Sequence, residues 1–255
     1  MKKGLLTALT VLLCLPLLAQ DDNEEENNVS GDFLDLFDDT RETRDVRTDT
    51  ELVIAFGWNQ ALGDDNGIGD DYRFWGSGIF DVGLEFNTRL QKNDDLFRMT
   101  YGLNLRTQSL RINGNREFAT FDNVTNLEPT SIEVDRSRFR QFSLVAPLHL
   151  EIGRRTVEEY DNGVKRYEGG KGFIVGIGGY LGYTTSSTQE LDFEREGREV
   201  TTTVTNDFEI NAFNYGLSFY AGWDHLQFFA LYGLNDMFKD SPLQQQQVSF
   251  GIRLR

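Results

Sequence analysis

Short segments in which apolar and polar residues alternate recur through most of this 255-residue chain. In the stretch LFRMTYGLNLRTQSL, residues 96–110, Arg98 and Arg106 fall on one face. The apolar residues fall on the other: Phe97, Met99, Tyr101, Leu103 and Leu105. A period of two is typical of a β-strand with two different faces. The apolar face could point to the core of a soluble protein or to lipid, and this stretch alone does not decide between them.

Eight such segments follow one another. They lie near residues 52–59, 80–87, 97–108, 142–151, 172–183, 213–223, 226–234 and 248–255. An even number of antiparallel strands is typical of single-chain barrels of the bacterial outer membrane. No segment beyond the N-terminus approaches the ~20 consecutive apolar residues of a membrane helix, so any insertion into a membrane must use β-structure.

The connections between the segments alternate in length. The long ones are the first, third, fifth and seventh, near residues 60–72, 112–136, 185–207 and 235–246, and the short ones are the second and sixth, near 91–95 and 224–225. Long loops on one side and short turns on the other are the outer-membrane arrangement. The fourth connection, 155–170, is long but contains Asn162-Gly163, a pair typical of a tight hairpin, so we expect its strands to continue past the membrane.

The polar faces contain many glycines as well as charges. Glycine weakens a solvated strand, but inside a narrow eight-stranded barrel it leaves room for large inward residues such as Tyr180, Arg106 and Tyr220. The opposite faces carry Phe, Leu, Val and Ile in mid-strand and Tyr or Trp near the ends, as a lipid-facing band does. We therefore expect the apolar face of residues 97–105 to point outward, and Arg98 and Arg106 to point into the barrel.

Inward charges need partners, because a buried charge is costly unless it is paired. The second and third segments form a hairpin over residues 91–95, and one register places Asp81 opposite Arg106. We predict an Asp81–Arg106 pair inside the barrel, with Glu85 close by.

The N-terminus, MKKGLLTALTVLLCLPLLAQ, has two lysines, an apolar run and a small residue before polar sequence. It is typical of a secretory signal peptide over residues 1–19, cleaved after Ala19. We interpret Cys14 as part of the apolar run rather than as a lipidation site, because Leu13 before it is bulky. The remaining chain then has no cysteine and folds without disulfides.

Residues 20–50 form an acidic segment, predicted to be a disordered periplasmic tail. Within it, residues 21–50 hold twelve Asp or Glu and three Arg, a large share of the formal net charge of −16. The apolar island at residues 33–37 is either a docking segment or incidental to a linker, and we favour the linker. So acidic a chain is a poor candidate for nucleic-acid binding.

The chain resembles the outer-membrane β-barrel domain family (porin-family, PorT-like) and, more distantly, the OmpA/OmpX-type small barrels. The resemblance lies in VAPLHLEIG (145–153), KGFIVGIGGYLGY (171–183), NYGLSFYAGW (214–223), ALYGLNDMF (230–238) and the terminal VSFGIRLR. It implies residence in the outer membrane, contact with its lipids and insertion by the barrel-assembly machinery, but no single activity. Many such proteins end in an aromatic residue recognised during insertion, whereas this chain ends in Arg255.

Residues suited to catalysis or cofactor binding are sparse. His225 falls in a tight turn, and His149 with Glu151 faces inward near the periplasmic end, away from the outer rim where such barrels generally place their chemistry. The acidic loop GDDNGIGDDY (63–72) could hold a hard cation, but we favour a solvated surface loop. GIGGYLG (176–182) lies within a strand and opens no helix, so it is no phosphate loop. We expect no catalytic, cofactor-binding or metal residues, and no cofactor.

The sequence therefore predicts an all-β protein, an eight-stranded antiparallel transmembrane up-and-down β-barrel over residues 51–255, located in the outer membrane. The favoured function is a non-enzymatic structural or interaction role through extracellular loops, with an unknown extracellular or periplasmic protein partner. The alternatives are a small pore or transport-associated protein, a soluble periplasmic lipocalin-like barrel with its apolar face inside, and an envelope enzyme dependent on His149.

Overall fold

The computed structural model describes residues 47–63, 70–91, 94–159, 165–168, 172–223, 225–239 and 241–255, with the backbone alone at 156–159 and 165–168. The predicted signal peptide and most of the predicted acidic tail lie outside the described residues. None of the described residues forms a helix long and apolar enough to cross a membrane.

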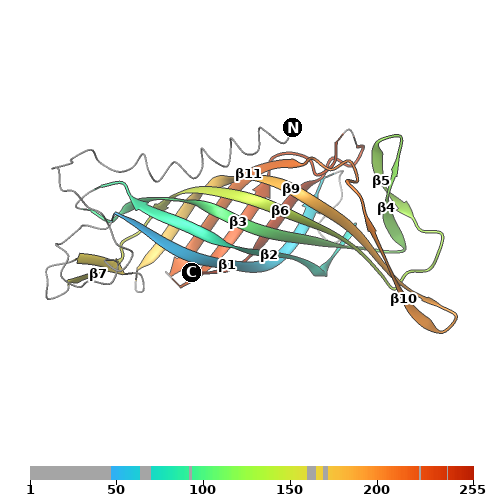
Figure 1. The fold of residues 1–255 in the computed structure, drawn as a ribbon, viewed down its shortest axis with the longest axis horizontal. Helices are drawn as coiled ribbons and strands as arrows, with labels where there is room; N and C mark the ends of the chain where they lie inside the picture. The colour runs from blue at the N-terminus through green and yellow to red at the C-terminus, as the bar shows by residue number, and fades with distance from the viewer. Residues whose placement is uncertain are drawn as a thin grey trace, which may run out of the picture. The chain divides into compact units, whose positions relative to one another are not determined.

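Eight strands pair in a closed antiparallel ring, which confirms the predicted up-and-down barrel (Figure 1). They are β1 (Thr48–Leu62), β2 (Tyr72–Arg89), β3 (Phe97–Ile112), β6 (Arg136–Ile152), β9 (Phe173–Arg195), β11 (Phe213–Trp223), β12 (Leu226–Gly233) and β13 (Gln246–Leu254). Each pairs with the next, and β13 pairs with β1 to close the ring. Closure removes the unpaired edges that an open sheet would expose.

Additional strands extend three of the connections. β4 (Arg116–Phe121) and β5 (Val124–Pro129) form a hairpin in the third, and β10 (Arg198–Thr205) pairs with the end of β9 in the fifth. The β4–β5 turn, Asp122-Asn123, has positive φ at both residues, as tight hairpin turns require. β7 (Thr156–Glu159) and β8 (Lys165–Glu168) pair across the fourth connection, whereas Asn162-Gly163 lies outside the described residues. Figure 1 shows β4, β5 and β10 at one end of the barrel and β7 at the other.

Two strand boundaries differ from the expected ones. β1 begins at Thr48 and so takes in the last three residues of the segment interpreted as an acidic tail. There the Thr48 hydroxyl lies 2.9 Å from that of Thr88 on β2. β9 continues to Arg195, through sequence interpreted as a loop, because its polar second half pairs with β6 on one side and with β10 on the other.

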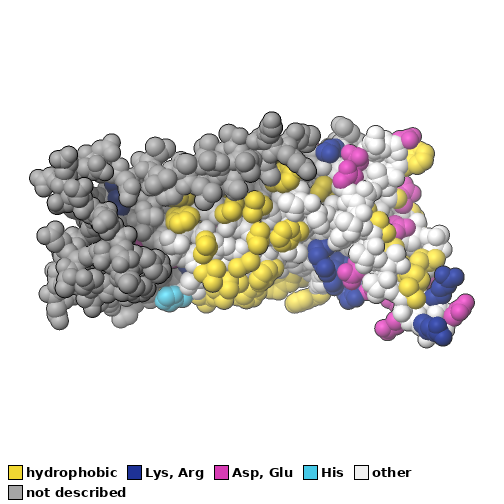
Figure 2. Space-filling model, viewed as in Figure 1, with side chains coloured by type: hydrophobic (Ala, Val, Ile, Leu, Met, Phe, Trp, Pro, Cys, Tyr) yellow, Lys and Arg dark blue, Asp and Glu magenta, His cyan; other side chains and the backbone are white. Residues whose placement is uncertain are grey.

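The apolar faces point outward, as predicted. Arg98 is 1% exposed and Arg106 4%, whereas Leu105 is 46% exposed. Figure 2 shows outward apolar side chains gathered over the middle of the ring strands on the face in view. Tyr101, also on this face, is buried and stacks on Phe86 with ring centroids 5.6 Å apart. This arrangement contradicts the lipocalin-like alternative, because a lipocalin-like barrel would have its apolar face inside.

Glycines make room for large side chains in the interior. A Cβ atom at Gly176 would lie 2.1 Å from the ring of Tyr220, and one at Gly216 would lie 2.7 Å from that of Tyr180. Both tyrosines point inward and are buried. The glycine-rich polar faces are therefore the space into which these rings pack.

Candidate functional site

The predicted pair lies in the middle of the barrel interior. Asp81 on β2 is directly opposite Arg106 on β3, and Arg106 Nε donates to Asp81 Oδ2 over 2.8 Å. Arg106 also lies over the ring of Tyr180, 4.7 Å from its centroid. Both charges are buried, so their pairing offsets the cost of removing them from water.

Glu85 lines the same small cavity as Asp81 and Arg106, as predicted, but it pairs with another arginine. Arg253 on β13 places Nη2 2.5 Å from Glu85 Oε2, and its guanidinium lies over Tyr220, 4.2 Å from the ring centroid. The sequence places Arg253 on the inward face. The pairing depends on ring closure, which places β13 next to β1, one strand away from β2.

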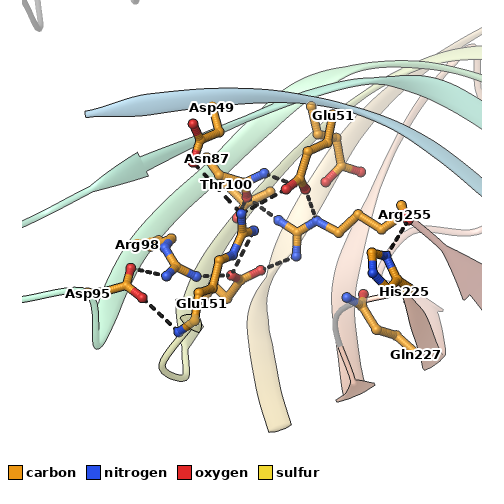
Figure 3. Close-up of polar contacts among 12 residues, drawn as sticks. Asp49, Glu51, Asn87, Asp95, Arg98, Thr100, Glu151, His225, Gln227 and Arg255 are labelled. Atoms are coloured by element: carbon orange, nitrogen blue, oxygen red, sulfur yellow. Dashed lines mark hydrogen bonds and ion pairs between the residues drawn. The ribbon is translucent and has the colours of Figure 1, made fainter. Parts of the chain in front are cut away.

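A basal ion network fills the end of the barrel beside the short turns (Figure 3). We use this name for Glu51, Glu151, Arg98, Arg155 and Arg255, together with Asp95, Asn87 and Thr100. Glu151 is fully buried, and it accepts from Arg98 Nη1 at 3.1 Å and from Arg255 Nη1 at 2.6 Å. Arg255 also donates to Glu51 and Asn87, and Arg155 Nη1 donates to Glu51 at 2.8 Å. Sequence analysis placed Arg98 and Glu151 inward but did not predict that they meet each other or Arg255.

The two histidines lie where the sequence placed them. His225 follows the end of β11, and its Nδ1 lies 3.4 Å from the backbone oxygen of Arg255. His149 is buried, with Nε2 2.7 Å from Ser218 Oγ and its ring against Tyr220. The neighbouring Glu151 accepts from the Tyr220 hydroxyl at 2.8 Å as well as from the arginines. His149 and Glu151 are thus both held in packed, hydrogen-bonded positions.

An outer apolar plug closes the opposite end of the interior. We use this name for Tyr72, Leu110, Ile112, Phe118, Phe139, Phe208, Ile210, Met237 and Phe238, which form one buried cluster. Phe118 comes from β4, and its ring centroid lies 4.8 Å from that of Phe139 and 4.9 Å from that of Phe238. Sequence analysis missed the plug because five of its members come from the connections between ring strands. The only signal was the presence of large apolar residues in otherwise polar loops.

The described residues line two small spaces between the plug and the basal network. One cavity of about 30 Å³ lies beside Asp81, Arg106, His149 and Tyr220, and another of about 20 Å³ lies beside Gln141 and Tyr180. A water molecule needs roughly 10–15 Å³ measured in this way. Each of these spaces is therefore large enough for only a few water molecules.

The acidic loop is described only in part, since residues 64–69 lie outside the described residues. Asp71 Oδ1 accepts from Arg116 Nη1 over 2.8 Å. Within the described part of the chain, no three His, Cys, Asp or Glu side chains are grouped so that they could hold a metal ion. The GIGGYLG stretch lies within β9, as predicted.

Comparisons with known proteins give few matches. No known protein family matches the sequence. No curated protein matches it either. Among solved structures, the chain is similar to Ail, the attachment invasion locus protein of Yersinia pestis, with 14% identity and a TM-score of 0.33, covering 82% of this chain and 99% of Ail.

Proposed function

We propose that this protein is an integral outer-membrane barrel whose filled interior does not conduct ions, and whose extracellular loops act in envelope structure or in binding an unidentified protein partner. One combined observation carries the proposal. The apolar band faces outward, and the interior is filled at one end by the basal ion network and at the other by the outer apolar plug. In the proposed orientation, the β4–β5 and β9–β10 hairpins face the cell exterior and the short turns face the periplasm.

The contents of the interior argue against the pore alternative. Open aqueous channels are typical of barrels of about sixteen strands, whereas an eight-stranded interior is filled by side chains. Here the basal ion network, the Asp81–Arg106 pair and the outer apolar plug succeed one another along the barrel. His149 and Glu151 are both buried within this packing, which supports a non-enzymatic role.

The segments that sequence analysis assigned to export complete the proposal. A signal peptide over residues 1–19 would deliver the chain to the periplasm, and the barrel-assembly machinery would insert it into the membrane. Outer-membrane lipids would then contact the apolar band, and residues 20–47 would remain on the periplasmic side.

Planar-bilayer recording tests the closed interior. We expect the purified, refolded barrel to insert without steady openings. The double variant R98A/R255A, which removes two arginines from the basal ion network, should remain closed as well, because the outer apolar plug is intact. Large, steady openings of the unmodified protein would overturn the proposed non-conducting role.

A further inference from the structure

Three arginines lie side by side in one cross-strand row on the outside of the barrel. Arg73 on β2 is directly opposite Arg111 on β3, and Arg111 is directly opposite Arg138 on β6. Their neighbours in sequence, Tyr72, Ile112 and Phe139, are buried in the outer apolar plug, so the arginines point outward. Like charges directly opposite each other destabilise a sheet, so this row costs stability unless something neutralises it.

The nearby carboxylates form their ion pairs with arginines outside the row, although Glu190 on β9 lies directly opposite Arg138. Glu190 and Asp192 on β9 pair with the two flanking arginines instead: Arg136 Nε lies 2.6 Å from Asp192 Oδ2, and Arg140 Nη2 lies 3.6 Å from Glu190 Oε2. None of the three arginines in the row forms an ion pair with a described residue. Arg73 Nε donates to the amide oxygen of Asn113 at 3.4 Å, and Arg138 Nε is buried without a hydrogen-bond partner.

The electrostatic environment reflects this surplus of positive charge. Arg136 and Arg140, two residues before and after Arg138 on β6, share its outward face, and Glu190 lies opposite Arg138 on β9. This surplus of positive charge is local, because the chain as a whole carries a formal charge of −16.

The backbone is shaped to hold the row in place. The β2–β3 register shifts between Arg73 and Gly78, and within this bulge Gly76 has φ +100°. A Cβ atom at Gly76 would lie 2.8 Å from Cδ of Arg111, so the Arg111 side chain lies across the glycine. The hydroxyl of Ser77 accepts from the backbone amide of Arg111 at 2.8 Å.

The row lies at the outer edge of the apolar band. Next to Arg73 in sequence are Phe74 and Trp75, which cluster with Trp58 and Phe250 on the outside of the barrel. Aromatic clusters of this kind mark the level at which hydrocarbon gives way to headgroups. Figure 2 shows basic and acidic side chains together at the end of the apolar band toward β10.

We propose that Arg73, Arg111 and Arg138 form a site for the phosphate groups of anionic lipid headgroups in the outer leaflet. Guanidinium groups bind phosphate through paired N–H donors, and a row of them would engage a headgroup that carries several negative charges. The site is bounded on the β9 side by a cleft that Arg111 and Arg136 line together with the carboxylates of Asp135, Asp192, Glu194 and Glu199. This inference rests on the proposed membrane location.

The test compares two arginine pairs with the same cross-strand geometry. R111Q/R138Q removes two members of the row, and R195Q/R198Q removes the pair that is directly opposite at the tip of the β9–β10 hairpin. Each protein is inserted into vesicles of phosphatidylcholine, with or without lipid A, a phosphorylated glycolipid, and its Tm is measured. We expect lipid A to raise the Tm of the unmodified protein and of R195Q/R198Q, and R111Q/R138Q to lose most of that rise.

Two controls distinguish lipid binding from a change in intrinsic stability and from binding of free phosphate. In phosphatidylcholine alone, R111Q/R138Q should melt at or above the Tm of the unmodified protein, because repulsion within the row is relieved. An equal lipid A effect in both variants would overturn the site, and a rise of the same size with inorganic phosphate in phosphatidylcholine would overturn its assignment to lipid. Failure to insert into vesicles would contradict the proposed function, whereas insertion without any lipid A effect would contradict this inference alone.

Discussion

Glu51 on β1 lies directly opposite Glu85 on β2 inside the barrel, and each carboxylate is neutralised by a different arginine of the C-terminal segment. Arg255 pairs with Glu51, and Arg253 pairs with Glu85. Two like charges facing each other would destabilise the β1–β2 pair, so Arg253 and Arg255, together with Arg155 beside Glu51, supply the charges that make this pair stable. The stability of the barrel is therefore coupled to the closure of β13 on β1.

Replacement of Arg255 by alanine should lower the free energy of unfolding by about 3–5 kcal/mol, since it leaves Glu51 and Glu151 with fewer partners in a buried site. Urea unfolding in lipid vesicles measures this change. Arg195→Ala, at the exposed tip of the β9–β10 hairpin, is the control and should change stability by less than about 0.5 kcal/mol. Equal losses in the two variants would show that the network contributes no stability.

The Asp81–Arg106 pair gives a second contrast, between two arginines of the same strand. Arg106→Ala should cost about 3–5 kcal/mol, because it leaves Asp81 buried and unpaired. Arg111→Ala should cost little or increase stability, because Arg111 belongs to a row of like charges. A double-mutant cycle with Asp81→Ala should give a favourable coupling energy for the pair. A coupling energy of zero would contradict the register in which Asp81 faces Arg106.

Two phenylalanines of β4 provide a matched pair of variants. One tests packing in the outer apolar plug, and the other controls for general effects of a substitution in the hairpin. Phe118 is 4% exposed and Phe121 is 79% exposed. Phe118→Ala should cost about 3–5 kcal/mol and should make the β4–β5 hairpin more sensitive to protease, because it leaves a cavity against Phe139 and Phe238. Phe121→Ala should leave protease sensitivity unchanged. Limited proteolysis of the membrane-inserted protein distinguishes the two, and identical cleavage rates would argue against a packed plug.

A glycine tests the packing of the barrel interior. Gly176→Ala should prevent normal folding or lower stability strongly, because the new Cβ would overlap the Tyr220 ring. Adding Tyr220→Leu should recover part of that loss, since the smaller side chain vacates the space. Electrophoresis of unheated samples, in which the folded barrel and the unfolded chain migrate differently, measures the folded fraction of both variants. Full folding of Gly176→Ala alone would contradict the observed contact.

Much of the barrel could be predicted from the sequence, because a period of two assigns every strand residue to one of two faces. Once the apolar faces are outward, Arg98, Arg106 and Arg255 must all be inside, and the short hairpin between β2 and β3 sets Asp81 opposite Arg106. Contacts between strands distant in sequence could not be found in this way. The pairing of Glu85 with Arg253 depends on the register at which the ring closes.

The outer end was less predictable for a different reason. Phe208, Met237 and Phe238 lie in irregular connections, where no periodicity shows which side chains turn inward. The polar half of β9 resembled a loop, because its outward residues, Thr188, Glu190 and Asp192, face water beyond the apolar band. The alternation of inward and outward residues in this half of β9 could be recognised only from its pairing with β6 and β10.

The most direct test of the membrane barrel and its orientation uses epitope tags inserted at the Asp122-Asn123 turn of β4–β5 and, separately, near Asn162 between β7 and β8. Intact cells are treated with protease, and their membranes are then washed with carbonate. We predict that the protein stays in the membrane and that only the tag at residues 122–123 is cleaved. Release by carbonate with both tags protected would contradict the lipid-facing apolar band and the proposed location.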